Sequence, residues 1–335
     1  MKIGRQENAF TIKLIASIAV FLAMFTVSIA FGAADISLKD VWMSLFSTSE
    51  GSDLSIIREI RLPREVGAAL VGAALAIAGA IMQGMTRNPL ADPGLLGLTA
   101  GANAALAISI VFFPALNYFG IIFACFAGAA AGAAIVFGIG ASRRGGFSPF
   151  RIILAGAAVS AFLQAIAEGI GIYFKVSKEV SMWTAGGLIG TSWGQLQIIT
   201  PFILIGIILS VALSRQLTIL SLNEEVAVGL GQKTTQIKGV LFVMIILLTG
   251  ASVALVGNIT FIGLMVPHIV RAFVGTDYRY ILPVSAFAGA SLMLLADTVG
   301  RTINAPWETP VASIIAVMGL PFFLLIVRKG GSAFQ

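Results

Sequence analysis

Three arginines are placed where they could bind anionic groups. Arg61 and Arg64 are three residues apart before an apolar run, and Arg301 follows another apolar run near the end of the chain. Residues three apart in a helix lie on one face, and each guanidinium is a permanently charged fork that binds a carboxylate through two parallel hydrogen bonds. The arginines can therefore bind carboxylates presented from outside the chain, or they can pair with lipid phosphate or with acidic residues of this chain. The internal candidates are Glu59, Glu65 and Asp297.

Residues 222–231 have the pattern of a short amphipathic helix. An asparagine suits the N-cap, two glutamates in the first turn complement the helix dipole, and a glycine suits the end. Three apolar residues spaced by four form a stripe on one face. Such a stripe either binds a partner surface or packs on the ends of the chain's own helices, and the spacing leaves both open. The residues concerned are Leu222, Asn223, Glu224, Glu225, Val226, Ala227, Leu230 and Gly231.

Neither a nucleotide site nor a metal site can be argued from the residues. A phosphate-binding loop needs a glycine directly before the lysine, and here Gln232 separates Gly231 from Lys233. His268 and Cys125 are each the single residue of their type, which excludes a disulfide within the chain and leaves no ligand cluster. We predict no catalytic residue, no cofactor and no metal site.

Two acidic residues, Glu168 and Asp297, fall inside apolar runs. A charge at the centre of a membrane helix costs roughly 2.5–3.5 kcal/mol on insertion scales, so each carboxylate needs a partner or water. Asp297 is four residues before Arg301, and an ion pair on one helical face explains it. Glu168 lies near the end of its run, where either snorkelling or a water-filled path would serve. A proton-coupled secondary transporter would use such acids, and this class remains an alternative.

The elements that must position these residues are membrane-spanning helices. The chain of 335 residues is 58% hydrophobic and 11% charged, far below the roughly 25% charge of soluble domains. We therefore predict an all-α, polytopic membrane protein with about ten helices in a single domain, 1–335. The expected helices are 14–33, 64–84, 94–112, 120–141, 152–170, 197–213, 237–256, 261–273, 281–299 and 311–327.

The basic residues predict the orientation. If the N-terminal segment 1–13 and the loop 214–236 are cytoplasmic, fourteen of the 21 Lys and Arg residues lie inside, as the positive-inside rule favours. The first helix is longer than the apolar core of a signal peptide, so we expect it to be retained. The remaining seven basic residues lie outside: Lys39, Arg58, Arg61, Arg64, Lys175, Lys178 and Arg301. The three arginines described first are thus exceptions that need a reason.

Glycines inside the helices and a repeated pattern indicate close packing. In lipid, small residues let helix backbones approach one another, and we expect the glycines of Gly128-Ala-Ala-Ala-Gly132 to pack within the chain rather than between two chains. The second and seventh helices run in opposite senses, and each is followed by a Pro-interrupted turn or short helix, at 88–93 and at Pro267. This pattern indicates an inverted repeat, as in many transporter folds.

From about residue 55 onward the chain resembles the FecCD permeases, the membrane subunits of ABC importers for ferric siderophores, haem and vitamin B12. The resemblance is carried by several long motifs in the same order. They are Arg61-Leu-Pro-Arg64, Val71-Gly-Ala-Ala-Leu-Ala-Ile-Ala-Gly79, Asn88-Pro-Leu-Ala-Asp-Pro-Gly-Leu-Leu-Gly97, Phe261-Ile-Gly-Leu-Met-Val-Pro-His-Ile269, Gly275-Thr-Asp-Tyr-Arg279 and Leu294-Leu-Ala-Asp297.

The resemblance implies a ten-helix subunit in a bacterial cytoplasmic membrane, with both termini in the cytoplasm. Its partners would be a second permease subunit (the same chain or a paralogue), cytoplasmic ABC ATPase subunits and an extracytoplasmic substrate-binding protein or lipoprotein. By this resemblance residues 223–231 form the coupling helix that sits in a groove of the ATPase. Arg61, Arg64 and Arg301 would receive glutamates from the two lobes of the binding protein.

The resemblance also implies a cytoplasmic gate before the fifth helix. Family members often have small hydroxyl residues there, whereas this chain has Ser148-Pro149-Phe150, which predicts a bulkier, stiffer gate. The expected function is the permease of a ferric siderophore importer, with vitamin B12 or haem as the alternative cargo. An ion-coupled secondary transporter is the alternative from another class.

Overall fold

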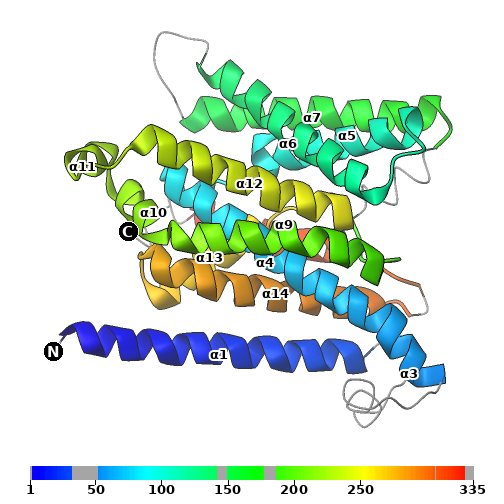
Figure 1. Ribbon diagram of the computed structural model, residues 1–335, viewed down its shortest axis with the longest axis horizontal. Helices are drawn as coiled ribbons and strands as arrows, with labels where there is room; N and C mark the ends of the chain where they lie inside the picture. The colour runs from blue at the N-terminus through cyan, green and yellow to red at the C-terminus, as the bar shows by residue number, and fades with distance from the viewer. Residues whose placement is uncertain (1, 32–51, 142–148, 177–185, 306, 329–335) are drawn as a thin grey trace.

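The computed structural model describes residues 2–31, 52–141, 149–176, 186–305 and 307–328, and every regular element in these residues is a helix (Figure 1). Eight helices are long and apolar enough to cross a membrane, and two shorter apolar helices accompany them. The long ones are α1 (Lys2–Ala30), α4 (Leu62–Thr86), α6 (Tyr118–Ala141), α7 (Pro149–Tyr173), α9 (Trp193–Ala212), α12 (Thr234–Val256), α14 (Tyr278–Thr302) and α15 (Val311–Arg328). The short ones are α5 (Leu98–Phe112) and α13 (Ile262–Val274). The ten predicted helices are all present.

The remaining elements are brief and lie between the apolar helices. The predicted cytoplasmic loop 214–236 contains two of them, α10 (Ser214–Leu222) and α11 (Glu224–Gly229). A 3-10 helix, η2 (Gly94–Leu96), follows Asp92, whose carboxylate accepts a hydrogen bond from the Gly94 N–H at 2.7 Å. This Asx turn holds the connection between α4 and α5.

Helix α4 begins earlier than the prediction of residue 64. Helix α3 (Ser52–Ile56) runs through a π-helical segment, η1 (Ile57–Arg61), directly into α4. The predicted helix followed the apolar run, which charged residues and Pro63 interrupt on its N-terminal side. The prediction was wrong at this boundary: Pro63 does lie in the first turn of α4, but the wider π turn before it continues the helix.

Helix α4 is the centre of the bundle and is buried along most of its length. Gly72 lies directly against the backbone of Gly289 in α14, and Gly79 lies against Gly263 in α13. A Cβ atom at Gly72 or Gly79 would collide with a backbone carbonyl, so no larger residue fits without moving a helix. The small side chains of α4 therefore set how closely α13 and α14 approach it.

Helices from the first half of the chain pack against helices from the second half. Helix α4 packs on α12, α13 and α14, and α12 also packs on α5 and α6. Within the first half, Gly128 and Gly132 of α6 lie against the backbone of Gly101 and Gly97. The glycine motif of α6 thus packs within the chain as predicted.

The bundle has two distinct ends. In Figure 1, α3 and the start of α4 lie at one end, and α10 and α11 lie at the other. Helix α1 runs along α14, where Phe10 stacks on Tyr280 with ring centroids 4.4 Å apart, and Lys13 donates to the Phe273 carbonyl at 2.5 Å. We call the two ends the α3 end and the α11 end. The predicted site residues divide between them.

Candidate functional site

At the α3 end, the three arginines come together with two carboxylates. The start of α4 meets the end of α14, which brings residues more than 230 positions apart into contact. We call this group the arginine cluster, and its members are Arg61, Arg64, Glu65, Asp297 and Arg301. The Glu65 and Asp297 side chains are completely buried. Each of these carboxylates is paired with arginine, which offsets the desolvation of its charge.

Arg64 lies between a buried carboxylate and a surface one. Its Nε and Nη2 donate to Asp297 at 3.0 and 2.8 Å. Its Nη1 and Nη2 also donate to the two carboxylate oxygens of Glu308 at 2.8 and 2.9 Å. The side chain of Arg64 is 12% exposed and that of Glu308 is 35% exposed. Arg64 is therefore bound through both edges of its guanidinium.

Arg301 is enclosed by the cluster. Its Nη2 lies 2.6 Å from Glu65 Oε1, and its Nε lies 2.9 Å from Asp297 Oδ2. The predicted ion pair between Asp297 and Arg301 is thus present, and Asp297 has a second arginine in Arg64. The side chain of Arg301 is only 6% exposed.

Arg61 and Arg301 also hold the end of α1. Arg61 donates from Nη1 to the Ile29 carbonyl at 2.6 Å, and Arg301 donates from Nη2 to the Ser28 carbonyl at 3.0 Å. The last carbonyls of a helix have no partner within it and carry the negative end of its dipole, so buried arginines stabilise them. All three arginines proposed from the sequence therefore make internal contacts. Internal pairing with Glu65 and Asp297, the alternative left open above, is present.

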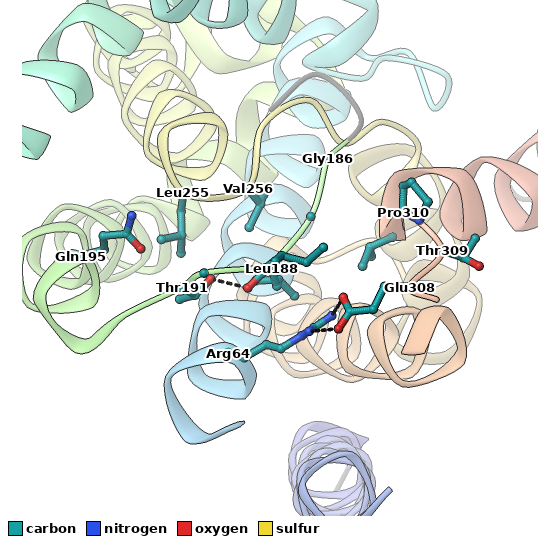
Figure 2. A pocket seen from close by; sticks show the side chains of 14 residues that line it. Arg64, Gly186, Leu188, Thr191, Gln195, Leu255, Val256, Glu308, Thr309 and Pro310 are labelled. Carbon is teal, nitrogen blue, oxygen red and sulfur yellow. Dashed lines mark hydrogen bonds and ion pairs between the residues drawn. The ribbon is translucent and has the colours of Figure 1, made fainter. Parts of the chain in front are cut away.

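A pocket of about 330 Å³ opens beside the cluster (Figure 2). Figure 2 shows Arg64 and Glu308 reaching toward each other at its wall, with Leu188 and Thr191 near the arginine. Its walls come from residues 186–191, the end of α12 and residues 308–311. Sequence reasoning missed Glu308, because it lies outside any helix and its contact with Arg64 spans 244 positions.

At the α11 end, the short amphipathic helix forms as expected. The side chain of Asn223 accepts a hydrogen bond from the Glu225 N–H at 2.9 Å, so the predicted N-cap is present. Glu224 pairs with Lys238 of α12 at 2.6 Å. The hydrogen bond from Lys238 lowers the pKa of Glu224, because it stabilises the charged carboxylate.

The apolar residues of the predicted stripe face away from the protein, although only Val226 lies on α11: Leu222 ends α10 and Leu230 follows α11. Leu222, Val226 and Leu230 are 67%, 46% and 68% exposed, and Val228 beside them is also exposed. Ala227 is buried and anchors the opposite face. Gly231 follows with a positive φ of 78°, which glycine adopts without strain. We call Leu222, Val226, Val228 and Leu230 the apolar patch. The alternative in which the stripe packs on the chain's own helix ends does not hold.

Helix α10 connects the patch to the core. Thr218 of α10 donates to the Asp277 carboxylate at 3.0 Å and accepts from the Tyr278 N–H at 2.9 Å. Arg271 of α13 donates to the Tyr278 hydroxyl at 3.0 Å and to Gln83 of α4 at 3.2 Å. A continuous route of hydrogen bonds thus runs from α10 to the central helix. Sequence reasoning did not identify it, because each bond joins residues from different helices.

Two predictions concern residues elsewhere in the bundle. Among the predicted gate residues, Ser148 lies outside the described residues, and Pro149 and Phe150 are the first two residues of α7. Glu168 is exposed on α7 and accepts a hydrogen bond from Gln164 at 3.2 Å. The gate assignment stays a prediction.

A bundle of apolar helices with a small-residue core and polar clusters confined to its ends defines a multi-pass membrane protein. The model of the FecCD transport family matches residues 20–329. The chain belongs to this family of transport permeases, as its motifs indicated.

Relatives in several bacteria are named for iron or haem import. The chain is 45% identical over 319 residues to the iron(3+)-hydroxamate import system permease protein FhuB of Bacillus subtilis (strain 168), covering 95% of this chain and 83% of that protein. It is 39% identical to the hemin transport system permease protein HmuU of Yersinia pestis, covering 92% and 94%. It is 37% identical to the ferric enterobactin permease FepD of Escherichia coli (strain K12), covering 90% of each chain.

A solved structure has the same fold. It is described as an inward-facing conformation of a metal-chelate type ABC transporter, and it superposes with a TM-score of 0.80 at 26% identity. The match covers 94% of this chain and 98% of that chain. The fold is therefore shared along nearly the whole chain.

Proposed function

We propose that this chain is the membrane-spanning permease subunit of a bacterial ABC importer that moves a ferric siderophore into the cytoplasm. ATP is hydrolysed by a separate subunit, and the permease converts closure of that subunit into alternating access. The observation that carries this proposal is the exposed apolar patch at one end of a FecCD-family bundle, because such a patch is suited to a protein partner. The 45% identity to an iron(3+)-hydroxamate permease supports the cargo.

Haem and vitamin B12 are the second candidate cargoes. The 39% identity to a hemin permease supports haem, since its match is nearly as long. The motifs shared by the family concern the ends and the packing of the bundle, so they leave the chemistry of the pathway open. An ion-coupled secondary transporter is the competing class.

The orientation follows from the distribution of basic residues. We place the α11 end and both termini in the cytoplasm and the α3 end outside the bacterial cytoplasmic membrane, because fourteen of the 21 basic residues then lie inside. The arginine cluster faces the extracytoplasmic compartment in this orientation.

The coupling element is α11 with its flanking residues. Leu222, Val226 and Leu230 bury their apolar side chains in a groove of the ABC ATPase, while the pair of Glu224 and Lys238 holds the helix on α12. Asn223 and Glu225 close the first turn, Ala227 anchors the helix, and Gly231 ends it. Movement of the ATPase then reaches α4 through α10.

The docking site for the extracytoplasmic substrate-binding protein is the arginine cluster. Arg64 is the most exposed of its three arginines and is the one that meets an acidic side chain of the partner. Arg61 and Arg301 stabilise the structure beside the docking surface, because they donate hydrogen bonds to carbonyls at the end of α1. A second permease subunit, either the same chain or a paralogue, completes the pathway.

Uptake in vesicles tests this function. The chain is reconstituted with its ATPase and binding protein, and uptake of a radiolabelled ferric hydroxamate is measured with ATP, without ATP, and with an ion gradient alone. We expect uptake only with ATP. Full uptake from the ion gradient without ATP would contradict the importer. Parallel assays with haem and vitamin B12 identify the cargo.

A further inference from the structure

The arginine proposed to bind the partner is already bound. Both edges of the Arg64 guanidinium are occupied, one by Asp297 and the other by Glu308. A carboxylate from outside can gain Arg64 only if one of these two leaves. We propose that Glu308 is an internal competitor, which holds Arg64 until an acidic side chain of the substrate-binding protein displaces it. This inference rests on the proposed docking at Arg64.

The surroundings decide which carboxylate leaves. Asp297 is fully buried, belongs to a helix, and is bound by Arg301 as well as by Arg64. Glu308 is 35% exposed and lies in a non-helical segment between α14 and α15. A buried carboxylate with two arginines loses far more when it is released than an exposed one does. Glu308 is therefore the group that exchanges.

The pocket provides the place for the exchange. It lies beside the pair, and both Arg64 and Glu308 line it together with Leu188, Leu255 and Val311 (Figure 2). An acidic side chain entering the pocket reaches Arg64 along the same face that Glu308 now occupies. The methylene groups of the entering side chain contact the apolar walls of the pocket, which adds a favourable contact to the ion pair with Arg64.

The balance of charge fits such an exchange. With Glu308, the three arginines of the cluster face three carboxylates, which are Glu65, Asp297 and Glu308. When a partner carboxylate replaces Glu308 at Arg64, the number of bonds to the guanidinium stays the same. Binding is therefore reversible and weaker than binding to an unoccupied arginine, as a transport cycle with repeated docking requires.

The test measures binding of the extracytoplasmic substrate-binding protein of the same importer, fluorescently labelled, to the permease–ATPase complex in lipid nanodiscs. We expect Glu308→Gln to tighten binding by about tenfold and Arg64→Gln to weaken it by a similar factor. When Glu308→Gln is added to Arg64→Gln, we expect no further change in affinity, because Arg64 is absent. Glu59→Gln, which removes the same charge from an exposed site on η1, is the matched control and changes affinity little.

Each other outcome overturns a specific step. Equal tightening by Glu59→Gln and Glu308→Gln shows a general charge effect and overturns the competitor. If Arg64→Gln weakens binding of the substrate-binding protein but Glu308→Gln does not tighten it, Glu308 is not a competitor. Docking at Arg64 then still stands. Unchanged binding by Arg64→Gln overturns the docking itself. If Glu308→Gln does not fold, Glu308→Asp replaces it, because the shorter side chain weakens the bond to Arg64 and gives a smaller gain.

Discussion

The two ends of the bundle offer different kinds of surface to a partner. At the α3 end, Arg64 and Arg301 are paired with carboxylates of the same chain. At the α11 end, four apolar side chains project from α11 and its flanking residues, and α11 is fixed by an N-cap and an ion pair. A partner at the α11 end needs only to cover apolar surface, whereas a partner at the α3 end must exchange one ion pair for another. The comparison predicts tight, stable association at the α11 end and weaker, transient association at the α3 end.

Asp297→Asn is expected to have the largest effect, on stability. The substitution removes the buried carboxylate that Arg64 and Arg301 share, and breaking such a buried pair costs about 3–5 kcal/mol. Thermal unfolding in detergent measures the change. Glu308→Gln is the control, because Glu308 is partly exposed and its loss is expected to cost about 1 kcal/mol or less. Equal shifts in the two variants would contradict the contrast between the buried and exposed sides of Arg64.

Leu230→Asp tests the apolar patch. A buried leucine side chain contributes about 1.5–3 kcal/mol, so a charge at this position should weaken the ATPase interface by tenfold or more. Transport should fall accordingly while the permease still inserts and folds, since Leu230 is 68% exposed in the chain alone. Leu230→Met preserves apolar surface and serves as the control. Normal ATP-driven uptake by Leu230→Asp would rule out the coupling role.

Tyr278→Phe tests the route from the patch to α4. The variant removes the hydroxyl that accepts a hydrogen bond from Arg271, and one such bond is worth about 0.5–1.5 kcal/mol. We expect a few-fold drop in substrate transported per ATP hydrolysed, with ATP hydrolysis itself retained. Tyr280→Phe, on the same helix, is the control because Tyr280 stacks on Phe10 through its ring. An unchanged ratio in Tyr278→Phe would show that this bond transmits nothing.

The smallest expected effect concerns pH at the α11 end. Lys238 lowers the pKa of Glu224 below its ordinary value of 4.5. The ion pair is therefore complete above that value and is lost only as the pH falls through the lowered pKa. A carboxyl titration followed by NMR should show this low value, and Lys238→Met should raise it toward 4.5. A titration unaffected by Lys238→Met would mean that the pair does not form in solution.

The sequence predicted the helices because their signal is local. Apolar runs, the Asn223 cap and the pairing of Asp297 with Arg301 each depend on residues within a few positions, and all are present in the structure. The start of α4 was misplaced because the prediction followed the apolar run, whereas a π turn continues the helix through the charged residues before that run.

The partners of the arginines could not be predicted in the same way. Arg64 meets Asp297 and Glu308, and Arg301 meets Glu65, across more than 230 positions of chain. A single sequence contains no signal for which of several acidic residues packs beside which arginine. The exposure of the apolar stripe could not be predicted from the sequence either. The spacing of Leu222, Val226 and Leu230 defines a stripe but does not tell whether another helix covers it.

The most direct test of this account is uptake with controlled sidedness. Proteoliposomes are prepared with the α11 end inside, so that ATP and the ATPase can be enclosed with the apolar patch while the binding protein and ferric hydroxamate are added outside at the arginine cluster. The account predicts uptake only in this arrangement, and none when ATP is supplied outside and the binding protein inside. Equal uptake in both arrangements, or uptake without ATP, would contradict it.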